Sequence, residues 1–170
     1  ERQRVALARA LAVQPRLLLL DEPLSALDAG LRERLAGDLR AILRAAGTTA
    51  LFVTHDHEEA FVVTDRLAVM RDGRLVQHGD IAEVWREPAD PDTALFLGYA
   101  RVLEGPAALR VLEAAGVPAP RRVPAVAVRR SAVTLAPDGP LHGVVLSVRA
   151  TPEQVRLVVD VEGVGELDAV

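Results

Sequence analysis

The sequence contains no cysteine and no lysine, few aromatic residues and no long apolar run. Without cysteine the chain can form neither a disulfide nor a thiolate metal site, which suits a reducing compartment. All 20 basic residues are arginine, so chemistry that depends on a lysine side chain cannot come from these 170 residues. Because only 3% of the residues are aromatic although 50% are hydrophobic, the core must be built from leucine, valine, alanine and isoleucine.

Charge and hydropathy set two further limits. A formal net charge of −4 is unlike the basic surfaces that bind phosphate backbones, so we expect no nucleic acid as a partner. The longest obvious apolar run, Leu17 to Leu20, is far shorter than the roughly 18 residues that a membrane-spanning helix needs. Membrane contact would therefore have to come through a partner protein.

The first part of the chain alternates predicted helices and strands, the pattern of an α/β fold. Apolar residues at helical spacing predict helices over residues 3–13 and 27–43, the second of them closed by Gly47. The apolar runs 17–20 and 48–54 end in polar or turn residues, as strands buried in a parallel sheet do. We therefore expect a mostly parallel sheet in this part of the chain.

Turn and capping patterns organise the rest of the chain. Asp56 and Glu59, like Asp80 and Glu83, have the spacing of a capping box at a helix start. Asp72-Gly73 between apolar runs predicts a hairpin, and a short helix is expected near residues 92–97. After a boundary near residues 99 to 105, valine-rich runs over residues 125–128, 143–148 and 155–161 predict a small all-β module.

Two of the predicted strands end in side chains suited to phosphate chemistry. Ligands of open α/β sheets bind beyond the carboxyl ends of the strands. Asp21 could hold a hard cation bound to phosphates, and Glu22 could orient or deprotonate an attacking water. His55, after the second strand, could donate a hydrogen bond to a phosphoryl oxygen. If the strands are parallel neighbours, these groups meet and describe hydrolysis of a nucleoside triphosphate.

Each of these residues also has a structural interpretation. Asp-Glu-Pro after a strand is often only a surface turn, and a single histidine at a strand end is more often structural than catalytic. Asp28 precedes the leucine-spaced helix, so N-capping is its simplest interpretation. The arginines at positions 2, 4 and 9 can equally form a solvated helix face.

Four motifs in order favour the nucleotide interpretation, because residues 1–98 resemble the second half of an ABC transporter ATPase. The matches are ERQRVALARAL (1–11) to the helix after the LSGG signature, LLLLDEP (17–23) to the Walker B strand, SALD (25–28) to the D-loop and THD (54–56) to the switch-histidine loop. The resemblance implies the second half of a P-loop NTPase fold.

The resemblance also implies ATP and Mg²⁺ as cofactors and assigns residue roles. Asp21 would be the metal residue, and Glu22 and His55 would be catalytic. In this family two ATPase subunits sandwich two ATP molecules, and a helix amino terminus of one subunit faces the nucleotide of the other, as its free N–H groups favour. The implied cofactor-binding residues are Glu1, Arg2, Gln3 and Asp28.

The later part of the chain narrows the resemblance to importers. VMRDGRLVQHG (69–79) and EVWREPADPDTALFLG (83–98) resemble the end of ATPases that serve binding-protein-dependent importers, and residues 99–170 resemble part of their OB-like TOBE module. The implied partners are a second ATPase subunit, transmembrane permease subunits and, indirectly, a solute-binding protein. The implied location is the cytoplasmic face of the cell membrane.

Two alternatives stay open beside the importer ATPase. One is an ABC ATPase outside transport, which the TOBE-like tail argues against. The other is a non-catalytic remnant or regulatory binding module that acts through residues 99–170.

We predict that the purified 170-residue chain neither binds ATP tightly nor hydrolyses it. The Walker A loop, the Q-loop and the first part of the signature are absent from the sequence, so no lysine and no glycine-rich loop holds the phosphates for Glu22. Exposed apolar surface on the first strand should also make the chain poorly soluble alone. Steady-state phosphate release tests the prediction, and turnover by the purified chain would contradict it.

Overall fold

The computed structural model describes residues 2–25, 27–118, 125–151 and 154–170. They form two compact units, residues 1–87 and 88–170. The boundary lies earlier than the 99 to 105 expected from composition, because helix α5 (Pro91–Phe96) packs with strand β5 (Arg101–Leu103) of the second unit. In the described residues no helix combines the length and the hydropathy that crossing a bilayer requires.

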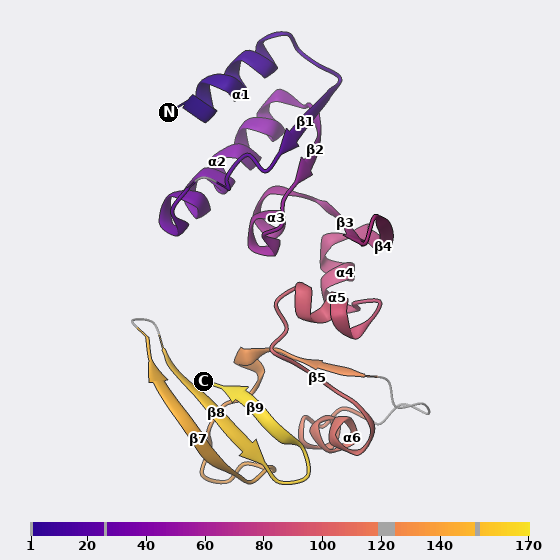
Figure 1. Ribbon diagram of the computed structural model, residues 1–170, viewed down its shortest axis with the longest axis vertical. Coiled ribbons are helices and arrows are strands. Elements are labelled where there is room, and N and C mark those ends of the chain that lie inside the picture. The colour runs from indigo at the N-terminus through magenta and orange to yellow at the C-terminus, as the bar shows by residue number, and fades with distance from the viewer. Residues whose placement is uncertain (1, 26, 119–124, 152–153) are drawn as a thin grey trace. The chain divides into compact units, whose positions relative to one another are not determined.

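The first unit begins with alternating helices and strands, as the sequence predicts (Figure 1). The elements are α1 (Arg2–Ala12), β1 (Leu17–Asp21), α2 (Ala29–Ala46), β2 (Thr49–Val53) and α3 (His57–Val63). Strands β1 and β2 pair in parallel, with Leu17 opposite Thr49 and Asp21 opposite Val53. The expected parallel neighbours are confirmed. Within the described ranges this is the single parallel pair, so a larger parallel sheet stays a prediction.

The core of this unit lies between helix α2 and one face of the two strands. Its buried residues come from β1, the loop after it, α2 and α3, namely Leu18, Leu24, Ala36, Leu39, Leu43 and Val63. Helix α2 begins at the predicted cap, where the Asp28 carboxylate accepts from the N–H of Leu31. It ends at Gly47, whose φ of 61° is the left-handed conformation that glycine adopts without strain.

The opposite face of the two strands is uncovered. Leu17, Leu19, Leu51 and Val53 are 54%, 66%, 56% and 48% exposed, and we call these four residues the bare sheet face. Strand residues two apart share a face, so Asp21 lies at the end of the row formed by Leu17 and Leu19. The expected exposure of apolar surface on the first strand is confirmed.

The first unit closes with a hairpin and a short helix. Strands β3 (Arg66–Arg71) and β4 (Arg74–Asp80) are antiparallel, and both turn residues have positive φ, 50° at Asp72 and 71° at Gly73. This is the primed turn that the Asp-Gly pair predicts. Helix α4 (Ile81–Arg86) follows, and the Asp80 carboxylate accepts from the N–H of Ala82 at its start.

The second unit combines strands with helices. Beyond α5 and β5 it contains α6 (Gly105–Ala114), β6 (Val126–Val128), the 3₁₀ turn η1 (Arg130–Ala132), β7 (Gly143–Ala150), β8 (Val155–Val161) and β9 (Gly165–Ala169). Strand β5 pairs with β6, and β7, β8 and β9 form an antiparallel sheet. The core residues are Leu103, Ala108, Val128, Leu157, Val159, Val161, Leu167 and Ala169.

The prediction that this module is all-β was wrong, although its three valine-rich strands are confirmed. Helix α6 starts with Pro106 in its first turn, a favoured position for proline. It turns Ala107, Ala108 and Val111 toward the core, which is helical spacing. That signal was present in the sequence, but the frequent glycine and proline residues around it favoured turns.

We predict opposite effects from two neighbouring substitutions in β1. Leu18→Ser, at a side chain 6% exposed, should abolish cooperative thermal unfolding, since losing a buried leucine costs about 2–5 kcal/mol. Leu19→Ser, at a side chain 66% exposed, should keep the unfolding transition and raise the monomeric fraction. Circular dichroism melting and light scattering after gel filtration measure the two effects. Equal loss of folding in both variants would contradict the assignment of faces.

Candidate functional site

Glu22 is the first residue beyond β1, and its backbone is held by three hydrogen bonds. Its N–H donates to the Val53 carbonyl at 2.9 Å, and its carbonyl accepts from the Ser25 N–H at 3.3 Å and the Ser25 hydroxyl at 2.9 Å. Its φ is 40°, an uncommon conformation for a residue with a side chain. The bonds to Val53 and Ser25 stabilise this turn.

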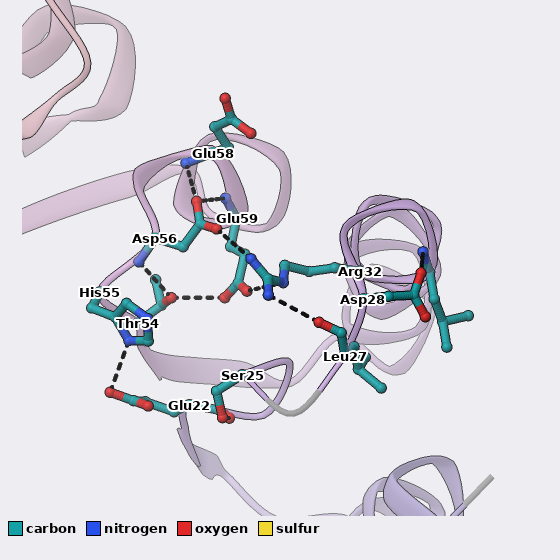
Figure 2. A network of polar contacts seen from close by, with 11 residues as sticks. Glu22, Ser25, Leu27, Asp28, Arg32, Thr54, His55, Asp56, Glu58 and Glu59 are labelled. Atoms are coloured by element: carbon teal, nitrogen blue, oxygen red, sulfur yellow. Dashed lines mark hydrogen bonds and ion pairs between the residues drawn. The ribbon is translucent and has the colours of Figure 1, made fainter.

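The Glu22 carboxylate contacts the His55 ring across the carboxyl ends of the two strands. His55 Nδ1 lies 3.1 Å from Glu22 Oε1 (Figure 2). The side chains are 70% and 47% exposed, so both are open to solvent. A hydrogen bond here requires a proton on Nδ1, which leaves Nε2 available as an acceptor in the neutral ring or as a donor in the charged ring.

Both neighbours of His55 in the chain are anchored. The Thr54 hydroxyl donates to Glu59 Oε2 at 2.7 Å and accepts from the Asp56 N–H at 3.0 Å. Asp56 Oδ1 accepts from the N–H groups of Glu58 and Glu59 at 2.9 and 3.4 Å and so caps α3. The capping box predicted for Asp56 and Glu59 is therefore present in modified form, because Thr54 stands between the Glu59 carboxylate and the Asp56 N–H.

Arg32 of helix α2 joins this loop to the loop before α2. Its Nη1 donates to Asp56 Oδ2 at 3.0 Å, and its Nη2 donates to the Leu27 carbonyl at 2.9 Å (Figure 2). Its Nε lies 3.5 Å from Oε1 of Glu59, a carboxylate only 5% exposed. The guanidinium thus contacts both carboxylates at the start of α3.

The charge on Asp56 is stabilised by this arrangement. Burial raises the pKa of the Asp56 carboxyl, but hydrogen bonds from the N–H groups of Glu59 and Glu58 and from Arg32 lower it more. The net pKa lies below the usual 3.8. Asp56 therefore remains a carboxylate throughout the neutral range.

The structure joins some of the predicted site residues and not others. Glu22 and His55 are in contact, whereas Asp21 is exposed at the end of β1 and Asp28 caps α2, both outside that contact. Glu1 lies outside the described residues. Arg2 and Gln3 begin helix α1.

Arg32, Thr54 and Glu59 are the contributors that sequence reasoning did not assign to the site. Arg32 is one of the polar residues that stand between the leucines of α2. Helical spacing places it on the polar side of the helix, but cannot show that its partner Asp56 stands 24 residues away.

Asp21 offers a single carboxylate, which fits a metal ion whose remaining ligands are phosphates and waters. Within the described parts of the chain, no group of three or more His, Cys, Asp or Glu side chains could hold a metal ion. Mg²⁺ is commonly bound by one or two carboxylates and completed by phosphates and waters. An exposed Asp21 can supply one such carboxylate.

Comparison with known proteins finds import ATP-binding proteins among the relatives of this chain. The chain is 50% identical over 143 residues to an Fe(3+) ions import ATP-binding protein of Streptomyces coelicolor. The aligned region covers 81% of this chain and 41% of that relative. It is 44% identical over 172 residues to a molybdate/tungstate import ATP-binding protein of Thermococcus kodakarensis, and the aligned region covers 98% of this chain and 51% of that relative. It is 50% identical over 120 residues to a sulfate/thiosulfate import ATP-binding protein of Cucumis sativus (71% and 34%).

The chain therefore spans about half or less of the length of the relatives that it matches. No protein-family model matches it. The matched region is nevertheless nearly the whole of this chain in the Thermococcus comparison.

We predict a pH-dependent stability difference between the native chain and Asp56→Asn. Asparagine still caps a helix, so the substitution chiefly removes the charge that faces Arg32. Because the folded pKa of Asp56 is below 3.8, its stabilisation is present above that pH and is lost as the pH falls through the folded pKa. Urea unfolding from neutral to acid pH should show the difference shrinking below pH 3.8.

The control is Asp72→Asn, in a hairpin turn where asparagine is equally suited. This variant should track the native chain at neutral pH. A stability difference for Asp56→Asn that does not change with pH would contradict the ion-pair interpretation.

Proposed function

We propose, from the homology of this chain to the ATP-binding subunits of ABC importers, that it is the carboxy-terminal part of an ATP-hydrolysing subunit that drives solute import. The observation that carries the proposal is the contact between Glu22 and His55 at the carboxyl ends of a parallel strand pair. A carboxylate and an imidazole at this edge are suited to activating water and contacting a phosphoryl group.

In the proposed reaction each of the two side chains has one role. Glu22 orients and deprotonates the water that attacks the γ-phosphate of ATP. His55 donates from Nδ1 to Glu22, and in the charged ring Nε2 carries the second proton and donates to a γ-phosphate oxygen. Mg²⁺, when bound with the nucleotide, supplies charge neutralisation on the phosphates, and Asp21 is the residue that would hold it through water.

A second ATPase subunit is proposed as the direct partner. Arg2 and Gln3 begin helix α1, where free N–H groups favour an anion such as the nucleotide of the other subunit. Together with Glu1, which precedes them in the sequence, they are the residues proposed for that contact. Asp28 uses Oδ1 to cap α2, which leaves Oδ2 for a contact across the subunit interface. Capping and interface contact are compatible roles for this carboxylate.

The phosphate-binding part of the site is proposed to come from another segment of the same domain. The relatives are at least about twice as long as the regions they share with this chain, and no lysine is present here to hold phosphates. Parallel sheets are normally covered on both faces. The bare sheet face, formed by residues 17, 19, 51 and 53, is the surface on which that segment would pack.

Residues 99–170 are proposed to belong to a TOBE-type module. The support is the antiparallel sheet β7-β8-β9 with the β5-β6 pair, which gives this unit its own core. Residues 126–130 read VAVRR where many such modules read VRPE, so no ligand is assigned to it. The further partners are the permease subunits and, through them, a solute-binding protein, at the cytoplasmic face of the membrane.

The imported solute is not assigned to these residues. Relatives of 44–50% identity are named for ferric ions, for molybdate or tungstate and for sulfate or thiosulfate. Similar identity to importers of such different solutes supports a common energising role. Solute selection is then left to the permease and the solute-binding protein.

The proposal is tested in a hybrid protein. Residues of this chain replace the matched 143-residue region of the Streptomyces coelicolor relative, which supplies the rest of the domain. We expect ATP turnover by the hybrid and a loss of about 10²-fold or more on Glu22→Gln, since that substitution removes the general base. Phosphate release under saturating ATP measures it.

Glu33→Gln is the matched control, because it makes the same chemical change at an exposed position on α2. It should leave turnover unchanged. A hybrid whose Glu22→Gln variant turns over ATP as fast as the parent would overturn the assignment. An inactive parent hybrid beside an active relative would favour the non-catalytic remnant.

A further inference from the structure

We propose that Arg32 is a positioning residue that holds His55 against Glu22. The inference rests on the proposed function for its catalytic meaning. In the described part of the chain, Arg32 contacts Asp56, Leu27 and Glu59 and makes no bond to either of the two reacting side chains. It acts through the residues on both sides of His55 and through the loop before α2.

Few contacts hold the His55 side chain in place. Its side chain is 70% exposed, and the described contact of its imidazole with a carboxylate is the one to Glu22 at 3.1 Å. A ring in that position is directed by the backbone that carries it. That backbone is the three-residue segment of Thr54, His55 and Asp56 between β2 and α3.

Both ends of this segment are linked by side-chain contacts to the Arg32 guanidinium. Asp56 reaches Arg32 directly through Oδ2 at 3.0 Å. Thr54 reaches it through Glu59, whose Oε2 accepts from the Thr54 hydroxyl at 2.7 Å and whose Oε1 lies 3.5 Å from Arg32 Nε. Figure 2 shows this chain of contacts and the separate contact between His55 and Glu22.

The Arg32 side chain is itself held in one orientation by a backbone carbonyl. Its Nη2 donates to the Leu27 carbonyl at 2.9 Å, in the loop that leads from Glu22 to α2. The planar guanidinium offers its donors in a rigid arrangement, which a lysine ammonium does not. One side chain therefore ties together the two loops that carry Glu22 and His55.

A purely structural role is the competing explanation. The Glu59 carboxylate is 5% exposed, and a buried negative charge needs a positive partner whatever the site does. Arg40 offers a matched comparison. It lies on the same helix, is 30% exposed where Arg32 is 31%, and also joins α2 to the α3 region, by donating to the Val62 and Thr64 carbonyls.

The test in the full chain uses NMR. We expect nuclear Overhauser contacts between the His55 ring protons and the Glu22 side chain in the native chain and in Arg40→Gln. In Arg32→Gln these contacts should be lost while those between α2 and β1 remain. Arg32→Lys should retain them only in part, because lysine keeps the positive charge but lacks the rigid arrangement of donors of the guanidinium. Retention of the His55–Glu22 contacts in Arg32→Gln would overturn the inference.

The test in the active hybrid uses a double-mutant comparison. Arg32→Gln should lower kcat about tenfold or more with little change in KM for ATP, because misplacement of a reacting group affects the chemical step. The same substitution in a His55→Ala background should change kcat by less than about twofold, since groups acting as a unit are not additive. Arg40→Gln should leave kcat unchanged in both backgrounds.

The two proposals fail differently. Equal loss of kcat from Arg32→Gln in both backgrounds would make Arg32 merely structural while the function stands. An inactive parent hybrid or an unaffected Glu22→Gln hybrid would overturn the function, and the NMR contacts would still decide whether Arg32 positions His55.

Discussion

The in-register parallel pairing of β1 with β2 is the constraint on which the site depends. Asp21 stands opposite Val53, and the Glu22 N–H continues the ladder by donating to the Val53 carbonyl. Both strands therefore leave the sheet at the same edge, which brings Glu22 and His55 within contact. A slip of one residue would turn Leu18 outward and Leu19 inward, since side chains alternate between faces. The hydrophobic core thus selects the register, and the register places the carboxylate near the imidazole.

Helix α2 supports this arrangement from one side through two different kinds of contact. Its apolar residues Ala36, Leu39 and Leu43 pack in the core with Leu18. On its polar side, contacts with the α3 region are made near the beginning of α3 by Arg32 and near its end by Arg40. The second is reinforced at Asp65, where hydrogen bonding from Arg44 and the charge of Arg40 lower the pKa of an exposed carboxyl. Exposed ion pairs stabilise little, so hydrogen bonds to carbonyls and the buried Glu59 matter more.

Most of the first unit could be predicted from the sequence, because its helix caps and its hairpin turn depend on residues that are close together in the chain. Gly47, Asp28 and the Asp72-Gly73 turn act through their own backbone geometry, and each appears as expected. The meeting of Glu22 with His55 followed from one assumption, that the strands are parallel neighbours. Helix α6 was missed because its short apolar pattern stood among turn-forming residues. The role of Arg32 could not be predicted, since the identity of a side-chain partner 24 residues away depends on tertiary packing.

The conformation of Glu22 gives an independent reason to regard this edge as functional. A residue with a side chain at φ 40° is strained, and glycine would adopt the same turn freely. Retaining glutamate there carries a conformational cost, and what it adds is a carboxylate against His55. Both side chains are open to solvent in this chain, whereas hydrolysis of a bound nucleotide requires that bulk water be excluded from the reacting groups. Under the proposed function, the surfaces that complete the site would have to cover Glu22 and His55 before the chemistry proceeds.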